Sequence, residues 1–174
     1  MKNKILEEKL SHEILDFLTQ RQTLHLASLD EDKHPYASYA PFAIGDDCLY
    51  VLLSDIAVHG KNLKINPQAA VLIVEDESQA QTIFARIRVT YQVNAEHLAI
   101  DTEAYRTGIQ CLFERHGDRI HNLAGLSDFN LFKLIPIHGR YVKDFGRAYS
   151  IEGQTLTGEN INHLRDGHKP RMSA

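Results

Sequence analysis

The sequence contains no tryptophan and two cysteines, Cys48 and Cys111. Each cysteine lies in an apolar setting, and the two have no CxxC spacing. No HExxH motif and no cysteine–histidine array with zinc spacing accompanies them. We therefore expect two core thiols, and a chain of 174 residues is long enough to bury a core without disulfides or metals.

Long apolar runs are also missing. No run approaches the roughly 20 residues of a membrane-spanning helix, and the first residues lack the uninterrupted apolar region of a signal peptide. No glycine-rich βαβ unit is present, which argues against a Rossmann nucleotide site. The formal net charge of −4 argues mildly against nucleic acid as a partner. We expect a cytoplasmic protein without membrane insertion.

What the sequence does contain is a series of short alternating segments. Hydrophobic periodicity and turn residues predict about seven short strands, with inserted helices, typical of an antiparallel barrel closed so as to leave few edges. We expect three parts: an amphipathic helix in residues 1–22, the barrel in 23–152, and a polar tail with little to bury in 153–174. The expected strands are 23–29, 36–42, 48–53, 69–74, 84–93, 129–135, 139–142 and 147–151, and the expected helices 2–19, 56–65 and 96–120.

The first candidate site surrounds the expected helix 56–65. Ser54 and Asp55 precede this helix, which also carries His59 and Lys61. The N-terminus of a helix attracts anions, so phosphate or a carboxylate could bind there. A Ser-Asp pair before a helix is also a common N-cap, and both interpretations stay open.

The second candidate is a pair of arginines. Arg86 and Arg88 fall on one face of the expected strand 84–93, opposite its apolar residues. Guanidinium groups in this arrangement can hold carboxylates or stack on a flat ring. The alternative is a solvated exterior of the barrel.

The third candidate is Asp128, which with Ser127 precedes the expected strand 129–135. A carboxylate at the end of an element can orient a metal-bound imidazole by accepting its ring N–H. Asp and Ser at this place also serve ordinary turn chemistry, which is the simpler interpretation.

The fourth candidate lies in the polar tail, where His163 and His168 stand five residues apart. A disordered tail is the default expectation. A tail that folds over a flat ligand could instead offer one axial nitrogen to a metal. His163 falls in a short segment expected to pack as a helical turn, whereas His168 follows the flexible Gly167. We therefore favour His168 as a ligand.

Together these segments resemble a known family. The resemblance covers about Thr23 to His168, nearly the whole chain, and the chain is similar to the HutZ/HugZ heme-utilisation proteins. Those belong to the split-barrel superfamily of pyridoxamine-phosphate-oxidase-like flavin proteins. The segments that carry it occur in this order: TLHLASLD, ASYAPF, LLSDIAVHGKNLKINP, VEDE, FARIRVT, LSDFNLFKL, YVKDFGRAY and RDGH.

The resemblance implies an α+β, mainly β, fold: an antiparallel split barrel with flanking helices, forming a homodimer with two heme sites at its interface. It implies that His168 ligates the heme iron, and that Asp128 of the partner subunit accepts a hydrogen bond from that imidazole. Arg88 would steady the heme, and His59 would line the pocket or meet a propionate.

The implied activity is that of a heme-degrading oxygenase, which opens the porphyrin ring with electrons from a small external donor. A heme-delivery protein is a further candidate partner. Two alternatives stay open. The protein could store or carry heme without degrading it, or it could be an FMN-dependent oxidoreductase with Ser54, Lys61 and Arg86 around the phosphate.

Overall fold

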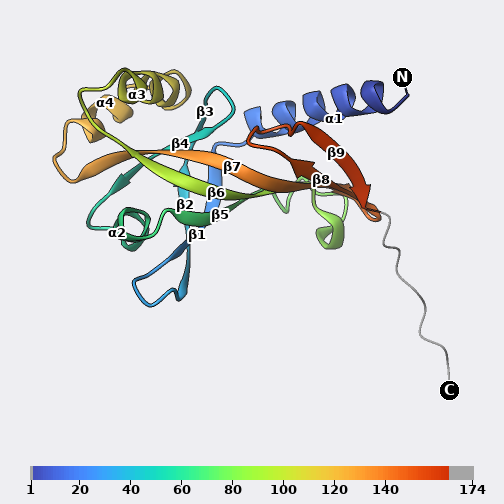
Figure 1. Ribbon diagram of the computed structural model, residues 1–174, viewed down its shortest axis with the longest axis horizontal. Helices are drawn as coiled ribbons and strands as arrows, with labels where there is room; N and C mark the ends of the chain where they lie inside the picture. Colours follow the sequence, from blue (N-terminus) through green and yellow to red (C-terminus); the bar gives the residue numbers. More distant parts are fainter. Residues whose placement is uncertain (1, 165–174) are drawn as a thin grey trace.

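The computed structural model describes residues 2–164, and these form a nine-stranded sheet with helices around it (Figure 1). The helices are α1 (Lys2–Thr19), α2 (Val58–Ile65), α3 (Glu103–His116), α4 (Arg119–Ala124) and a short 3₁₀ helix η1 (Ile83–Ala85). The strands are β1 (Thr23–Leu29), β2 (Pro35–Pro41), β3 (Ala43–Ile44), β4 (Leu49–Ser54), β5 (Gln68–Val74), β6 (Arg88–Leu98), β7 (Phe129–Asp144), β8 (Arg147–Glu152) and β9 (Asn160–Leu164).

All strand pairings in the described chain are antiparallel, and the main path runs in the order β2-β1-β5-β6-β7-β4-β3. Strand β8 pairs with β7, and β9 pairs with β8. The two ends of the path, β2 and β3, are not hydrogen-bonded to each other, so the sheet is not closed. The split-barrel prediction is confirmed, whereas the expectation of a closed barrel is wrong.

The core consists of two clusters, because β4 buries side chains on both of its faces: Val51 belongs to the larger cluster and Tyr50 to a second one that includes residues of α3. In β1, Leu24 and Leu26 are buried, whereas His25 and Ala27 are exposed, as the alternation predicts. Cys48 is buried and Cys111 is partly buried, and both are free thiols. The largest fully buried side chains come from α1, α3, strands in both halves of the chain and the residue between β2 and β3: Tyr91, Phe42, Phe132, Leu10, Ile14, Leu18, Leu24, Leu26, Leu49, Ile73, Leu112 and Leu131.

Helix α1 has the predicted bounds but packs with only part of its apolar stripe. Leu10 and Ile14 are buried, whereas Ile5 and Leu6 near the N-terminus are exposed. The guanidinium of Arg115 in α3 donates to the carbonyl groups of Leu18 and Arg21. The last carbonyls of a helix have no intrahelical partner, so this arginine satisfies them and fixes the end of α1 against α3.

Strands β6 and β7 depart most from the prediction. Strand β6 runs on to Leu98, where a helix was expected, because each residue pairs with β7 as far as Leu98 opposite Leu131. Strand β7 is continuous through Pro136, where two strands were expected. The register shifts between Gln92 and Val93, opposite this proline, which accommodates a residue without an N–H. These two strands are the longest in the described chain, and they pair with each other at the centre of the sheet.

Helix α3 begins at Glu103, later than expected, and the side chain of its N-cap residue Thr102 accepts a hydrogen bond from the N–H of Tyr105. The helix ends at Gly117, whose φ of 75° lies in the region that favours glycine. Among the described residues, no helix is both long enough and apolar enough to span a membrane.

The segment after Gly153 was expected to have little to bury, and this is wrong as far as Leu164. Leu156 and Ile161 are buried, and the Tyr91 hydroxyl donates to the carbonyl of Leu156. Strand β9 then adds to β8, so His163 lies in a strand and not in a helical turn. The division of the chain at residue 153 stays a prediction, and residues 165–174 lie outside the described part.

Candidate functional site

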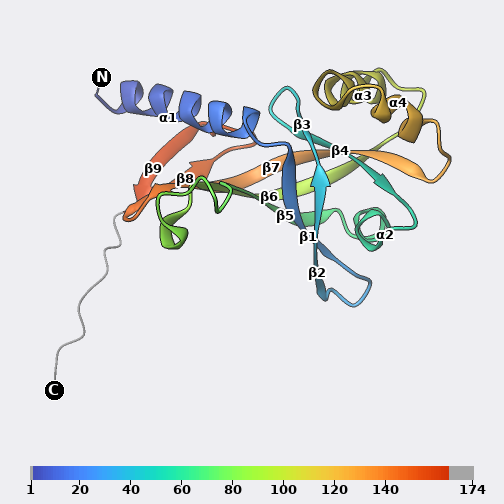
Figure 2. The same cartoon turned by 180° about the vertical axis from the view of Figure 1, so that it is seen from behind.

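The residues singled out from the sequence fall into two regions at opposite ends of β7 (Figures 1 and 2). One region, which we call the Asp128 cluster, consists of Ser54, Asp55, Asp128 and Asn130, where β7 begins. The other, which we call the arginine pocket, is the cavity that contains Arg88 and Arg140, where β7 ends.

In the Asp128 cluster the carboxylate is held by the chain around it. The Ser54 hydroxyl donates to Asp128 Oδ2 at 2.5 Å and accepts from the N–H of Ile56 at 3.0 Å. The backbone N–H of Asp55 donates to the carbonyl oxygen of Asp128 at 2.7 Å, and the Asn130 amide donates to the same oxygen at 3.1 Å. Asp128 is half-buried and its side chain is oriented by Ser54.

The interpretation of Ser54 as a helix N-cap is wrong. Helix α2 begins at Val58, and its N-cap residue, Ala57, makes no side-chain hydrogen bond. Ser54 turns the chain out of β4 by accepting from the N–H two residues ahead, the local bond typical of serine in turns. The same hydroxyl is thereby free to donate to Asp128, a partner that lies far away in the sequence.

Helix α2 is fixed beside this cluster by contacts that explain its sequence. The Asn62 amide donates to the Ser28 hydroxyl at 3.0 Å, and both side chains are buried. A Cβ atom at Gly60 would lie 2.2 Å from the carbonyl oxygen of Ser54, so only glycine allows this approach. Lys64 pairs with Asp55 at 2.7 Å, and this hydrogen bond is the main cause that lowers the pKa of Asp55.

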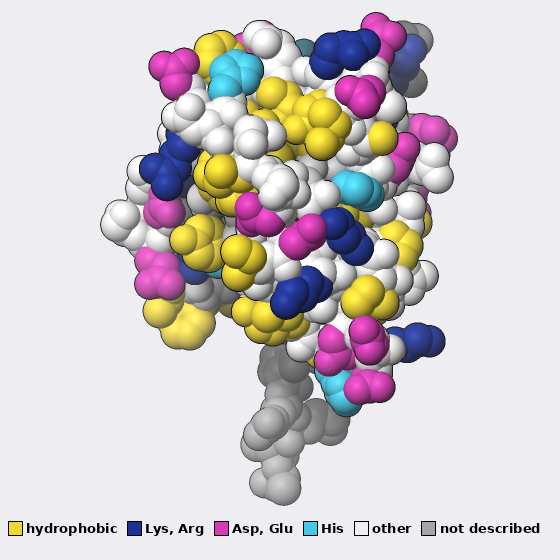
Figure 3. All heavy atoms as spheres, turned by 90° about the vertical axis from the view of Figure 1, so that its left-hand side faces the viewer, with side chains coloured by type: hydrophobic (Ala, Val, Ile, Leu, Met, Phe, Trp, Pro, Cys, Tyr) yellow, Lys and Arg dark blue, Asp and Glu magenta, His cyan; other side chains and the backbone are white. Residues whose placement is uncertain are grey.

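His59 faces β2 from helix α2. Its Nδ1 atom lies 2.9 Å from the Ser38 hydroxyl, and the ring is half-buried. Burial lowers the pKa of His59 from its ordinary value, since desolvation disfavours the charged imidazolium. Lys61, on the same helix, is exposed. Figure 3 views this end and shows acidic and basic side chains interspersed with hydrophobic ones.

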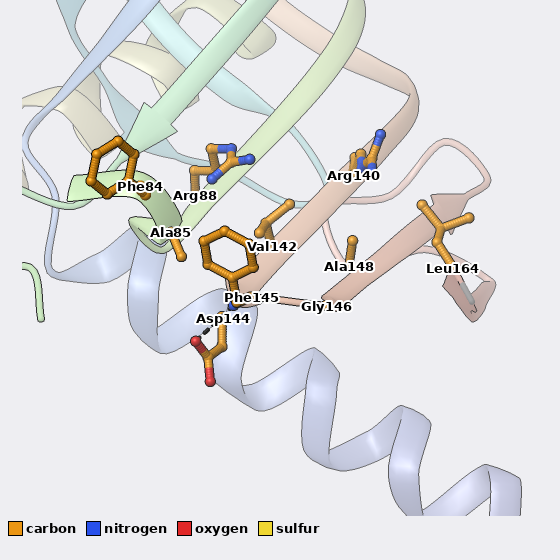
Figure 4. Close-up of a pocket in the computed structure, with 10 residues that line it drawn as sticks. All are labelled: Phe84, Ala85, Arg88, Arg140, Val142, Asp144, Phe145, Gly146, Ala148 and Leu164. Atoms are coloured by element: carbon orange, nitrogen blue, oxygen red, sulfur yellow. Dashed lines mark hydrogen bonds between the residues drawn. The ribbon is translucent and has the colours of Figure 1, made fainter. Parts of the chain in front are cut away.

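The arginine pocket is a cavity of about 550 Å³ on the outer face of β6, β7, β8 and β9 (Figure 4). Its floor follows the strand register, because Arg88 lies opposite Val142, Val142 opposite Ala148, and Ala148 opposite Leu164. Arg140 lies on the neighbouring row, opposite Thr90. The pocket therefore combines guanidinium groups with an apolar floor.

Two aromatic side chains border this floor. Phe84 of η1 is 80% exposed, and Phe145 of the β7–β8 turn is 61% exposed. Large apolar side chains that cluster on the surface around a cavity mark a binding site. Neither phenylalanine was predicted as a site residue, nor was Arg140. In the sequence, Phe84 and Phe145 lie within the FARIRVT and YVKDFGRAY segments, and Arg140 directly precedes the second of these.

The expectation that Arg86 and Arg88 share a strand face is wrong. Arg86 follows η1 and precedes β6, and its Nε atom donates to the carbonyl of Glu75 at 2.7 Å. Its guanidinium also pairs with Glu77 at 3.4 Å. Arg86 therefore closes the loop between β5 and β6, whereas Arg88 lies in the pocket.

The residues suggested for an FMN phosphate are not brought together in one protomer. Ser54 and Lys61 belong to the α2 end of the molecule. Arg86 lies beyond the far end of β5, the strand that leads away from α2. Their assignment to a phosphate stays a prediction.

His168 lies outside the described residues, four positions beyond Leu164. Four residues reach at most about 14 Å when fully extended. The fourteen steps along β7 from Asp128 to Val142, in the row that ends at Leu164, correspond to up to about 46 Å at 3.3 Å per residue. Figures 1 and 2 both show β7 extended along the molecule. Strand β7 thus separates Asp128 from Val142 and Leu164, and the pairing of His168 with Asp128 stays a prediction.

Comparison with known proteins places the chain among characterised relatives. The family model described as pyridoxamine 5′-phosphate oxidase matches residues 10–143, more than half of the chain. The protein named heme oxygenase HutZ from Vibrio cholerae is 40% identical over 169 residues, which cover 97% of this chain and 95% of HutZ.

Solved structures show the same fold. The crystal structure of Vibrio cholerae HutZ, there called a heme storage protein, is 41% identical with a TM-score of 0.70, covering 73% of this chain and 89% of that one. Campylobacter jejuni ChuZ is 30% identical with a TM-score of 0.83, covering 94% of this chain and 67% of that one.

Proposed function

The chain belongs to the pyridoxamine 5′-phosphate oxidase family, and from this premise we propose that it binds heme and opens the porphyrin ring to release iron. The observation that carries the proposal is the arginine pocket, which joins a cationic group to an apolar, aromatic surface. The 40% identity with the protein named heme oxygenase HutZ supports heme as the ligand.

The residues of the arginine pocket fit heme by chemistry and size. Heme is a flat apolar ring with carboxylates along one edge, so it needs an apolar surface and a cation beside it. Val142 and Phe145 supply apolar surface, and Arg88 supplies a guanidinium that can bond a carboxylate in two places. The cavity volume of about 550 Å³ falls within the range of small-molecule sites.

The iron ligand in this proposal is His168, which follows the pocket in the chain. Among the earlier histidines, His163 is already packed: its ring lies 5.1 Å from that of Tyr149, and its Nε2 atom lies 3.3 Å from the carbonyl of Gly146. His59 lies at the opposite end of the molecule, near the Asp128 cluster. Both positions support His168 as the axial ligand.

The site would be completed by a second subunit. Because Asp128 and the arginine pocket lie at opposite ends of β7, the carboxylate proposed to meet His168 would come from a partner subunit. We therefore propose a homodimer with two equivalent sites, as twofold symmetry requires. His59 of the partner would then approach the same heme from helix α2.

Bound heme would supply the oxygen chemistry through its iron, with electrons from a small external donor. The contribution of the protein is positioning and electrostatics. The Asp128 carboxylate, oriented by Ser54, would accept the ring N–H of His168, which fixes the imidazole tautomer and makes the opposite nitrogen a stronger ligand. The Arg88 guanidinium would fix the orientation of the heme by binding one of its carboxylates.

Degradation and storage are separated by one experiment. The purified protein is titrated with hemin, and the complex is then given ascorbate in air while the heme absorption band is followed. We expect the band to disappear and a bilin-type product to form, with catalase added to remove free peroxide as a control. A stable band would support heme storage, the role named for the solved HutZ structure.

The flavin alternative rests on the family match and is tested before hemin is added. A yellow protein that releases flavin on denaturation would favour an FMN-dependent oxidoreductase. We expect a colourless protein that turns red-brown with hemin. Alanine variants of His59, His163 and His168 then identify the ligand by electron paramagnetic resonance, and only His168→Ala should lose the histidine-ligated spectrum, with partial recovery in free imidazole.

A further inference from the structure

We infer that Arg140 and Arg88 form one site for two carboxylates, so that the arginine pocket recognises the acidic edge of a porphyrin independently of its iron. This inference rests on the proposed function, since it names how the same pocket selects its ligand. Nothing in the sequence pointed to Arg140, and its place in the site comes from the pairing of β6 with β7.

The strand register places the two arginines together. Arg88 lies opposite Val142 and Arg140 lies opposite Thr90, so the two arginines occupy diagonal positions on neighbouring strands. Diagonal neighbours on one sheet face lie about 7–8 Å apart at Cα, within reach of long side chains. Figure 4 shows both guanidinium groups on the same side of the cavity.

The charge of this pair is not neutralised by the described residues. Arg88 donates to the backbone carbonyl of Arg86 at 3.0 Å, and no described carboxylate forms an ion pair with Arg88 or Arg140. Asp144 lines the cavity, but it accepts from the N–H of Phe145 and points away from both guanidinium groups (Figure 4). A bound dianion would supply the carboxylates that the described residues do not provide.

The floor beside the arginines selects the kind of dianion. Val142, Ala148 and Leu164 form an apolar row next to Arg88, and Phe84 and Phe145 border it. A free phosphate would leave this surface in water, whereas a flat ring covers it and brings its own carboxylates to the guanidinium groups. The geometry therefore points to a planar aromatic dicarboxylate.

The test uses iron-free mesoporphyrin IX as the diacid and as its dimethyl ester, because neither can be ligated by a histidine through iron. Binding to the full-length protein is followed by porphyrin fluorescence. Arg140→Gln removes the second guanidinium, and Arg119→Gln on exposed α4 is a control with the same change in charge. Arg140→Lys tests whether a cation alone is enough.

We expect the wild-type protein to prefer the diacid over the ester by about tenfold or more, a ratio consistent with charge-assisted hydrogen bonds. Arg140→Gln should lose most of this preference, Arg140→Lys should keep part of it, and Arg119→Gln should keep all of it. Equal preference in Arg140→Gln and the wild type would overturn the inference.

The hemin experiments separate this inference from the proposed function. Wild-type protein that degrades hemin but does not distinguish the diacid from the ester contradicts the two-carboxylate site and leaves the function in place. Protein that selects the diacid through Arg140 but never degrades hemin supports the site and contradicts the proposed oxygenase.

Discussion

The two ends of β7 differ in how their polar groups are used. In the Asp128 cluster, the carboxylate accepts from Ser54, and Asp55 pairs with Lys64. In the arginine pocket, Arg140 has no ion pair among the described residues and Phe84 is 80% exposed. The polar groups of the Asp128 cluster are therefore paired with one another, whereas the described residues provide no ion-paired carboxylate for the guanidinium groups of the arginine pocket.

This difference assigns a role to each end. The Asp128 carboxylate accepts from the Ser54 hydroxyl, and the backbone of Asp128 is fixed because its carbonyl oxygen accepts from Asp55 and Asn130. Such a carboxylate is suited to orienting another group. Exposed aromatic rings beside guanidinium groups are suited to binding a ligand. Because β7 keeps the ends apart, the proposed site needs one end from each of two protomers.

The largest expected effect comes from Asp128→Asn, which keeps the size of the side chain but removes its charge. Heme should still bind through the arginine pocket, whereas degradation should slow about 10-fold or more, as expected when a group that orients a metal ligand is changed. Hemin titration and single-turnover rates measure the two separately. A rate within about twofold of the wild type, below that roughly 10-fold floor, would leave Asp128 with a structural role only.

Gly60→Ala should destabilise the Asp128 cluster, because the added methyl group would clash with the backbone of Ser54. The new Cβ atom would lie 2.2 Å from the carbonyl of Ser54, so α2 or the end of β4 has to move. We expect a loss of about 1–3 kcal/mol in the free energy of unfolding. Gly125→Ala is the matched control, because its Cβ would lie at an ordinary 3.5 Å from its nearest neighbours. Equal stability of the two variants in urea denaturation would contradict the close packing of α2.

Tyr91→Phe acts at the pocket end. The Tyr91 hydroxyl is the donor for the Leu156 carbonyl in the segment that leads to β9. Removing it leaves a buried acceptor without that partner and should cost about 1–2 kcal/mol in the free energy of unfolding. Tyr36→Phe, at an exposed position of β2, should change stability little. In Tyr91→Phe, backbone amide hydrogen exchange should increase more in β9 than in β6, relative to the wild type.

The smallest expected effect is the pH dependence caused by His59. Burial lowers the pKa of this side chain in the folded protein below the 6.5 of a free histidine. The unfolded chain therefore binds the proton more readily, and the stability associated with neutral His59 is full above pH 6.5 and is lost as the pH falls towards the lower folded value. His59→Gln should lose less stability than the wild type on acidification. A parallel loss in both proteins would contradict this.

The sequence predicted the elements with a clear hydrophobic period, such as the alternation of strand β1 and the 3.6-residue period of helix α1, because these patterns are local. It failed at residues 94–98, where helix-forming residues continue β6 because β7 pairs with them. Arg88 was singled out from strand periodicity as one of two arginines, and the family resemblance then suggested its role. Arg140 was missed because its position beside Arg88 depends on the register of two strands, which shifts at Gln92.

The contacts of the Asp128 cluster could not be predicted from local sequence patterns either. Ser54 was interpreted as a cap for the helix that follows it, which is the usual role of a serine before a helix. Its hydroxyl instead donates to Asp128, which is distant in the sequence but adjacent in the sheet, because β4 pairs with β7 and Ser54 lies opposite Phe129. A single sequence does not reveal such a partner, because it depends on which strands become neighbours.

The most direct test of the shared site is a mixed dimer of Asp128→Asn and His168→Ala protomers, purified through two different tags. If each site takes His168 from one protomer and Asp128 from the other, one of the two sites in this dimer keeps both wild-type residues. We then expect about half of the wild-type rate of heme loss per dimer, as twofold symmetry predicts. A mixed dimer no more active than its two parents would show that each protomer relies on its own Asp128, and would contradict the assignment of the two ends of β7 to one shared site.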